Sequence, residues 1–233
     1  MNQIAQNVAE VHARIAQAAA KSGRTAEDIT LVGVTKTIAP AEIAALLAAG
    51  VQTLGENKVQ ELLGKVDEPS LAGAEWHLIG HLQTNKVKYI ADRVTLIHSV
   101  DSEKLAAEID RRAEKIGRGM DVLVEINIAD ELSKHGVSAR DAENVVREIS
   151  RFRHVRVRGL MCVAPFAANS AENRALFEKM RKIFIDIQRK NYDNVYMDIL
   201  SMGMTNDYEI AVEEGATMVR VGTGIFGSRI YAV

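Results

Sequence analysis

Short apolar runs and amphipathic stretches alternate along the whole chain, and this alternation predicts strands and helices in turn. The run 31–35 is apolar and rich in β-branched residues, which is typical of a strand buried on both faces of a parallel sheet. Ile4, Val8, Val11 and Ile15 recur at helical spacing, so the chain is expected to open with an amphipathic helix.

The rest of the chain continues the pattern and predicts about eight strands. These fall at residues 31–36, a short segment up to 54, 76–79, 95–100, 122–128, 155–163, 197–201 and 218–221. Helices are predicted at 40–50, 59–66, 86–93, 102–117, 141–152, 171–190 and 206–213. Eight strands with helices between them are the count for a closed (β/α)8 barrel, and a doubly wound open sheet is the alternative. No linker or composition break divides residues 1–233, which predicts a single barrel domain with an extra N-terminal helix.

Polar residues inside two strands favour the barrel over the open sheet. In the strand 122–128, Glu125 and Asn127 alternate with apolar positions, and Arg220 lies between two valines on the last strand. An open sheet covered by helices on both faces would rarely bury such side chains, whereas a barrel has an inner face where they can meet one another or a ligand. These inner polar positions near strand ends are therefore candidates for a site.

Composition and charge exclude several classes of protein. The 233 residues are 47% hydrophobic but only 5% aromatic, which suits an aliphatic parallel sheet. The formal net charge of −2 gives no electrostatic case for binding nucleic acid or an anionic membrane. A single cysteine, Cys162, fits a reducing compartment, and its apolar neighbours predict a packed core thiol. With neither a signal peptide nor a spanning segment of ~20 apolar residues, we expect a cytoplasmic protein that binds no membrane.

Lys36 is the first candidate functional residue. It follows the buried run 31–35 directly, at the carboxyl end of a strand, where both barrels and open sheets place their active sites. Partial burial would lower the pKa of its amine and make the neutral form available for Schiff-base chemistry. The alternative is a lysine that only extends from the strand end into solvent.

Two loops carry the chemistry of a phosphate site. Ser201–Thr205 follows the seventh strand and Gly222–Gly227 follows the eighth, and both combine glycine with hydroxyl side chains. Small residues let backbone N–H groups approach an anion, and (β/α)8 barrels frequently bind phosphate with the loops after these two strands. The second loop also fits G-x-G-x-x-G, but only six residues follow it, without the helix and acidic residue of a dinucleotide fold.

Other patterns carry less chemistry. His77 and His81 are four residues apart on a predicted strand, without a carboxylate cluster to complete a metal site, so no metal is expected. The basic run 151–158 spans a helix end and a strand entry and is interpreted as a solvated face. The turn 55–57 is expected to bring polar groups to the barrel mouth, or else to cap a helix.

A reactive lysine and a phosphate-binding loop at one mouth point to pyridoxal 5′-phosphate (PLP). At this point the chain resembles the pyridoxal phosphate homeostasis proteins, which are related to the barrel domain of alanine racemase (fold type III of PLP proteins). The resemblance covers essentially the whole chain. Its motifs are Val34–Thr37, Gly55–Asn57, Trp76–Lys86, Gly159–Met161, Leu200–Met204 and Val219–Gly227.

The resemblance implies a role for each candidate residue. Lys36 would carry PLP as a Schiff base, and Arg220 would face the pyridine nitrogen, where a cation weakens the cofactor as an electron sink. Thr205 stands where many relatives have serine, which keeps a hydroxyl. The phosphate would be bound by Ser201, Gly222 and Thr223, and Asn57 and His77 would lie near the ring.

The same resemblance indicates a PLP carrier and not an efficient enzyme. Related racemases use a second acid–base residue, a tyrosine from an additional β domain, and this chain ends within a few residues of the last predicted strand. We therefore expect a monomeric protein that buffers PLP or delivers it to PLP-requiring apo-enzymes, without catalytic residues. A PLP-dependent racemase or decarboxylase is the alternative, and an aldolase with a Schiff-base lysine is a third.

Overall fold

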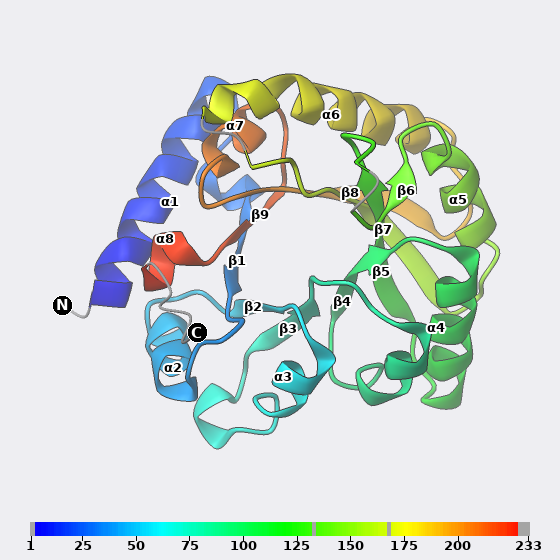
Figure 1. Cartoon of the computed structure of the whole chain (residues 1–233), viewed down its shortest axis with the longest axis horizontal. Helices are drawn as coiled ribbons and strands as arrows, with labels where there is room; N and C mark the ends of the chain where they lie inside the picture. Colours follow the sequence, from blue (N-terminus) through cyan, green and yellow to red (C-terminus); the bar gives the residue numbers. More distant parts are fainter. Residues whose placement is uncertain (1–2, 132–133, 167–168, 228–233) are drawn as a thin grey trace.

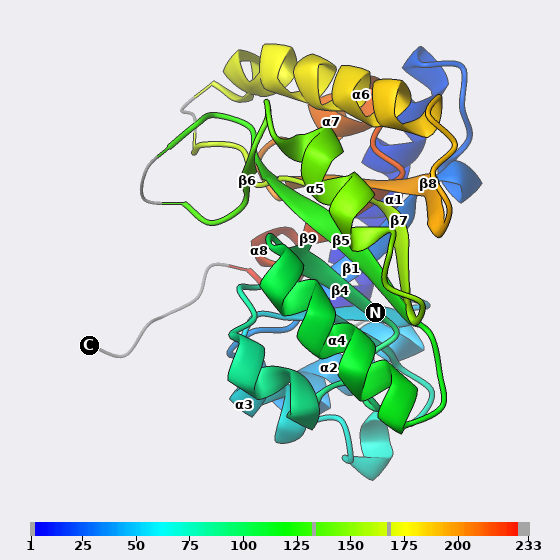
Figure 2. The same ribbon diagram turned by 90° about the vertical axis from the view of Figure 1, so that its right-hand side faces the viewer.

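The computed structural model describes residues 3–131, 134–166 and 169–227, which fold as one barrel of parallel strands inside a ring of helices (Figures 1 and 2). The barrel strands are β1 (Thr30–Val34), β2 (Thr53–Glu56), β3 (Glu75–Leu78), β4 (Leu96–Val100), β5 (Met120–Asn127), β7 (Val155–Met161), β8 (Val195–Met204) and β9 (Met218–Val221). Each pairs in parallel with its neighbours, and the pairings of β1 with β9 and of β4 with β5 close the ring. The predicted eight-stranded barrel is confirmed, with a two-residue strand β6 (Val137–Ser138) added beside β5.

The helices follow the strands around the outside. They are α1 (Gln3–Lys21), α2 (Pro40–Ala48), α3 (Val59–Leu63), α4 (Glu103–Lys115), α5 (Ala142–Ile149), α6 (Arg174–Gln188), α7 (Tyr208–Glu213) and α8 (Thr223–Phe226). Pro40 occupies the first turn of α2, and the Ser102 hydroxyl accepts the Leu105 N–H at the start of α4. None of the helices in these ranges is long and apolar enough to cross a membrane.

The extra N-terminal helix is present and packs as its pattern predicts. The apolar stripe Ile4, Val8, Val11 and Ile15 of α1 is buried, and the helix lies along α7, α8 and α2 (Figure 1). Because α8 directly follows the last barrel strand β9, α1 covers the outside of the barrel next to the end of that strand.

One predicted helix is of the 3-10 type. The sequence predicts a helix at 86–93, and the structure has a 3-10 helix at Thr84–Tyr89 followed by a turn through residue 93. Val87 and Ile90 are both fully buried, and their spacing of three residues matches the three-residue turn of a 3-10 helix.

The interior of the barrel is separate from the main core between sheet and helices. A small apolar cluster, Val32, Leu96, Leu123, Met161 and Met218, lies apart from the large one. Polar side chains share the interior with it, so the closed sheet encloses a mixed core with hydrogen-bonded groups at its centre.

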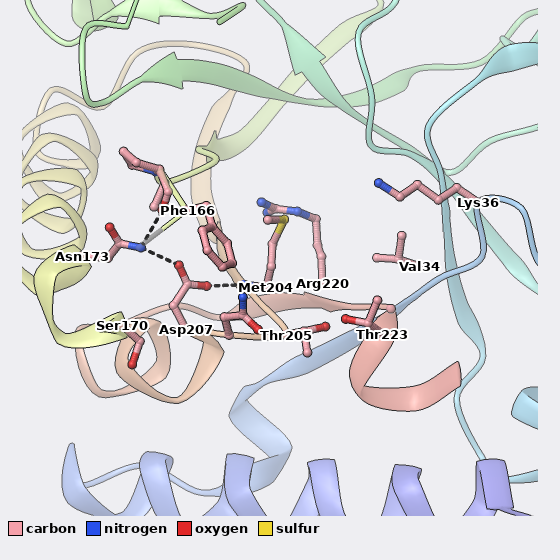
Figure 3. A pocket seen from close by; sticks show the side chains of 14 residues that line it. Val34, Lys36, Phe166, Ser170, Asn173, Met204, Thr205, Asp207, Arg220 and Thr223 are labelled. Atoms are coloured by element: carbon pink, nitrogen blue, oxygen red, sulfur yellow. Dashed lines mark hydrogen bonds between the residues drawn. The ribbon is translucent and has the colours of Figure 1, made fainter. Parts of the chain in front are cut away.

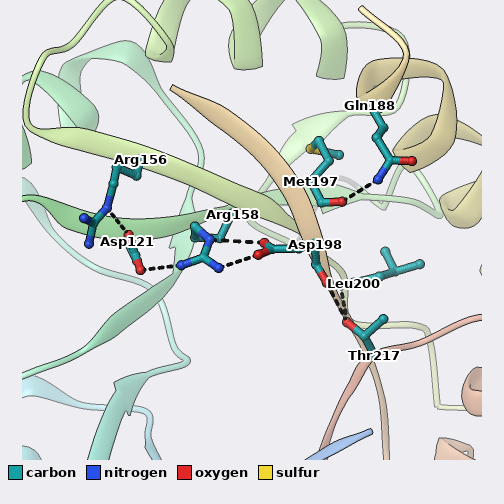
Figure 4. A network of polar contacts seen from close by, with 8 residues as sticks. All are labelled: Asp121, Arg156, Arg158, Gln188, Met197, Asp198, Leu200 and Thr217. Carbon is teal, nitrogen blue, oxygen red and sulfur yellow. Dashed lines mark hydrogen bonds and ion pairs between the residues drawn. The ribbon is translucent and has the colours of Figure 1, made fainter. Parts of the chain in front are cut away.

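Ion pairs join neighbouring strands at the N-terminal end of the barrel (Figure 4). Arg158 of β7 contacts Asp198 of β8 and Asp121 of β5, the latter at 2.8 Å, and Arg156 also reaches Asp121, at 2.5 Å. Part of the basic run 151–158 is thus bound in strand-to-strand pairs. Cys162 is fully buried, as predicted, and burial raises the pKa of its thiol to about 12.

Candidate functional site

A cavity of about 200 Å³ opens at the carboxyl end of the barrel strands, beside β1, β8 and β9 (Figure 3). Of its lining residues three are charged, Lys36, Arg220 and Asp207: two cations and one carboxylate give a net charge of +1. The remaining lining residues are Val34, Ala164, Pro165, Phe166, Ser170, Asn173, Met204, Thr205, Asn206, Gly222 and Thr223. A concave site of this composition, with two cations and several hydroxyl and amide groups converging on it, is suited to a small anionic ligand.

Lys36 extends into the cavity from the end of β1 (Figure 3). Alternate residues of a strand point to opposite faces, so Val34 and Lys36 face the barrel axis while Thr35 between them faces the helices. The Lys36 side chain is half-buried, and within the described ranges no hydrogen bond or ion pair engages its Nζ. A primary amine is therefore available to a ligand at this position.

A buried polar network outside the sheet fixes the backbone on which Lys36 is mounted. The Thr35 hydroxyl donates to Oε1 of Glu56 at 2.7 Å, and the Lys65 ammonium donates to the same Oε1 at 2.7 Å. Lys65 also donates to the Thr35 carbonyl at 2.8 Å. Glu61 then accepts the Thr37 N–H at 2.7 Å, where the backbone turns through a positive φ of 62°. Both neighbours of Lys36 are thus held by side chains from the region of α3.

This network corrects the expectation for the turn 55–57. Gly55 and Glu56 belong to β2, and the fully buried Glu56 side chain lies between sheet and helices instead of at the barrel mouth. Asn57 does not line the cavity; its backbone is packed against Gly80, where an added Cβ would fall 2.4 Å from the Asn57 carbonyl oxygen.

Arg220 forms the inner wall of the cavity. Its side chain is 3% exposed, and one terminal nitrogen donates to the Ser201 hydroxyl at 2.5 Å while the other donates to the Cys162 carbonyl at 2.8 Å. Burial lowers the pKa of this guanidinium, and the Glu125 carboxylate nearby opposes that shift. The polar position predicted on the inner face of the last strand is therefore confirmed as an inward-facing cation.

A chain of hydrogen bonds continues from Arg220 across the barrel interior. The Ser201 hydroxyl lies 3.2 Å from Nδ1 of His98, and Nε2 of His98 lies 3.0 Å from Nδ1 of His77. Arginine can only donate, so Ser201 accepts from it and its own proton is free to point at His98. His98 then donates through Nε2 to His77, which leaves the remaining N–H of His77 facing the far end of the barrel.

Both imidazoles are neutral, as this direction requires. Burial lowers the pKa of His77 to about 4, and burial, His77 and Arg220 hold the pKa of His98 well below its usual value. His77 lines a separate hollow at the N-terminal end of the barrel, with Glu75 and Asp121. Ser201 and His77 thus lie beneath the cavity, behind Arg220, and are absent from its lining.

The turn after β8 is held by a second group of side chains. Oδ1 of Asp207 accepts the Met204 N–H at 2.7 Å, and Oδ2 accepts the Asn173 amide at 2.9 Å. Gly203 has a φ of 90°, and a Cβ there would fall 2.5 Å from Ala211, so glycine is required at this bend. The turn carries Met204, Thr205 and Asn206 along the cavity wall (Figure 3).

The last loop joins this turn through its backbone. The Thr205 hydroxyl accepts the Gly224 N–H at 3.2 Å, and a Cβ on Gly224 would fall 2.9 Å from Val221 and 3.3 Å from Thr205. Glycine at this position lets the two loops meet. Gly222 and the exposed Thr223 stand beside them at the start of α8, with the Thr223 hydroxyl facing the cavity (Figure 3).

Of the seven residues that the resemblance places at the cofactor, the structure gathers Lys36, Arg220, Gly222 and Thr223 around one cavity. Asn173 and Phe166 were not anticipated, because the loop after β7 has no recognisable pattern. Asp207, in the turn after β8, was not anticipated either. His98 was also missed, although a polar residue inside the apolar run 96–100 was a signal that could have found it.

Comparisons with known proteins point to one family. The family described as "Alanine racemase, N-terminal domain" matches residues 2–230. A pyridoxal phosphate homeostasis protein of Aquifex aeolicus is 41% identical over 226 residues, which cover 97% of this chain and 98% of the relative. That of Escherichia coli K12 is 36% identical over 235 residues, covering 100% and 99%.

Solved structures agree. PipY of Synechococcus elongatus, solved with PLP bound, superposes with a TM-score of 0.83 at 34% identity, covering 96% of this chain and all of PipY. An alanine racemase of Clostridium difficile reaches a TM-score of 0.73 at 16% identity, covering 98% of this chain and 57% of the racemase. The second comparison bears on the fold alone.

Proposed function

The chain belongs to the family of the alanine racemase N-terminal domain, and from this premise we propose that it binds PLP in the mouth cavity and acts in intracellular PLP homeostasis. Relatives that carry this function in their names match it over nearly their full length, and PipY binds PLP on the same fold. The observation that carries the proposal is the unengaged Lys36 amine, which shares one positively charged cavity with Arg220 and the Thr223 loop.

The residues present suit each part of such a ligand. The Lys36 amine is the group that can hold the aldehyde as a Schiff base. The hydroxyl of Thr223 and the backbone of Gly222 stand where two glycine-containing loops meet, which suits the phosphate. Arg220 is positioned to face the ring. Ser201 supports Arg220 instead of reaching the phosphate, because its hydroxyl already lies between Arg220 and His98.

The same cavity favours a carrier over an efficient racemase or decarboxylase. PLP supplies an electron sink when its ring nitrogen is protonated, and a donor-only guanidinium at the ring does not favour that state. Racemisation also needs a second acid–base group. Among the described lining residues the single carboxylate, that of Asp207, is already engaged by Met204 and Asn173. The protein therefore holds the cofactor and releases it to apo-enzymes that require PLP.

The experiment that tests this proposal is an absorbance spectrum of the purified protein with PLP, before and after borohydride, followed by mapping of the modified lysine. We expect a visible band that borohydride removes and a pyridoxyl group on Lys36. Lys36→Ala should lose the reducible attachment, whereas Lys58→Ala, which changes an exposed lysine next to α3, should keep it. A cofactor fixed mainly on another lysine, or no visible band, would overturn the assignment.

A further inference from the structure

Three metal-ligating side chains meet on the barrel mouth, on the side away from β8 and β9. His81 follows β3, Asp101 follows β4, and His135 lies between β5 and β6. One ligand atom from each lies within 4.8 Å of the others, and Nδ1 of His81 is 3.9 Å from Oδ2 of Asp101. Both histidines are exposed and Asp101 is half-buried, so the cluster opens to solvent.

The contacts of these residues leave the ligand atoms available. The rings of His81 and His135 stack with centroids 3.7 Å apart and planes 11° from parallel, a contact that two charged imidazoliums would oppose. Neutral imidazole is the form that binds metal ions. The other oxygen of Asp101, Oδ1, accepts a hydrogen bond from the Ser102 hydroxyl at 3.1 Å, which orients the carboxylate and leaves Oδ2 free to bind.

We propose that His81, Asp101 and His135 form a binding site for a divalent ion of the zinc class. Two imidazoles and one carboxylate are a ligand set that such ions prefer, whereas Mg²⁺ and Ca²⁺ prefer oxygen alone. Ligands of a tetrahedral ion bound at about 2.1 Å lie roughly 3.4 Å apart. The distance of 3.9 Å between Nδ1 of His81 and Oδ2 of Asp101 must therefore shorten slightly when an ion binds. The lone pairs of stacked, nearly parallel rings lie in separate planes, so binding also requires the stack to open as the exposed rings turn about their Cβ–Cγ bonds and aim their nitrogens at one point.

This site could not be predicted from the sequence, because its members come from three different loops. His81 and His77 are four residues apart, but His77 points into the barrel and pairs with His98, while His81 stands at the mouth. Three protein ligands leave a fourth position for water or a further ligand. An ion there ties together the loops after β3, β4 and β5.

Isothermal titration calorimetry of the full chain with Zn²⁺ tests the site, with PLP removed first because the cofactor can itself chelate metals. We expect one ion per chain. His81→Ala, His135→Ala and Asp101→Asn should each weaken binding at least tenfold, while His12→Ala, which removes an exposed histidine from α1, should leave it unchanged. Circular dichroism confirms that each variant is folded.

A second measurement reports the coordination itself. Co²⁺ in a tetrahedral site gives intense visible absorption bands, which should appear with the native chain and vanish in Asp101→Asn. Lys36→Ala should bind Zn²⁺ as well as the native chain does, so the metal site stands or falls independently of the PLP proposal. The absence of Zn²⁺ binding with a dissociation constant below 1 mM (roughly −4 kcal/mol) would overturn the proposal. Binding that survives all three ligand substitutions would also overturn it.

Discussion

Replacing Lys65 by Met should destabilise the protein by about 3–5 kcal/mol, the usual cost of removing one partner of a buried ion pair. The Lys65 ammonium lies 2.7 Å from Oε1 of Glu56 and 2.8 Å from the carbonyl of Thr35, and the Glu56 side chain is fully buried. Without Lys65 the Glu56 carboxylate would retain only the Thr35 hydroxyl, because its other oxygen, Oε2, has no hydrogen-bond partner within the described chain.

Urea denaturation followed by circular dichroism measures this loss, and a double-mutant cycle assigns it. Glu56→Gln removes the charge that Lys65 neutralises, so the double variant should be destabilised by less than the sum of the two single ones. Lys21→Met is the matched control: Lys21 also lies 2.7 Å from a carboxylate, that of Glu213, but its side chain is 66% exposed. The control should change stability by less than about 1 kcal/mol. Additive effects at Lys65 and Glu56, or a Lys65 loss no larger than the control's, would refute the reasoning.

Three further predictions concern the barrel mouth and the barrel interior. Thr223→Val removes a hydroxyl that is proposed to donate a hydrogen bond to a charged group, and such a bond is worth about 1.5–3 kcal/mol. The affinity for PLP, measured by fluorescence titration, should therefore fall by roughly one to two decades, and the affinity for pyridoxal should fall much less. Equal losses for the two ligands would place Thr223 away from the phosphate. Burial, and then the charge of Asp101, raise the pKa of Glu125 to about 7 from its usual 4.5. Because the folded state binds this proton more tightly than the unfolded state, Glu125 contributes at most about 3 kcal/mol to the free energy of unfolding. This contribution is fully present below pH 4.5 and is lost as the pH rises through 7. Glu125→Gln should abolish that part of the decline in urea midpoints between pH 5.5 and 8, and parallel profiles would contradict it. In deuterated water with alanine and PLP, α-proton exchange followed by NMR should stay near the rate of free cofactor, and turnover on the order of 1 s⁻¹ would instead indicate an enzyme with a second base.

The local pattern was sufficient for the barrel because each strand and helix carries its own signal. The apolar run 31–35 forms β1, and the stripe of α1 is buried as its spacing predicts. Lys36 and Thr223 follow barrel strands, and the carboxyl ends of parallel strands share one rim, so the sequence could place them at one cavity. The pattern at 86–93 predicted a helix without its type, because so short an apolar pattern fits either an α-helix or a 3-10 helix, and the structure has a 3-10 helix at Thr84–Tyr89.

The partners of buried polar groups could not be determined from the sequence. Ser201 and His98 are 103 residues apart and meet only because the sheet closes, and the same closure brings Arg220 to the Ser201 hydroxyl. Glu56 is one residue from a position that faces inward, and strand alternation directs it to Lys65 instead of the mouth. Local sequence determines which segments are strands and which residues end them, whereas closure and alternation decide which side chains meet. Those are properties of the assembled sheet, because a hydrogen bond across the barrel depends on the registers of all the strands between its two ends.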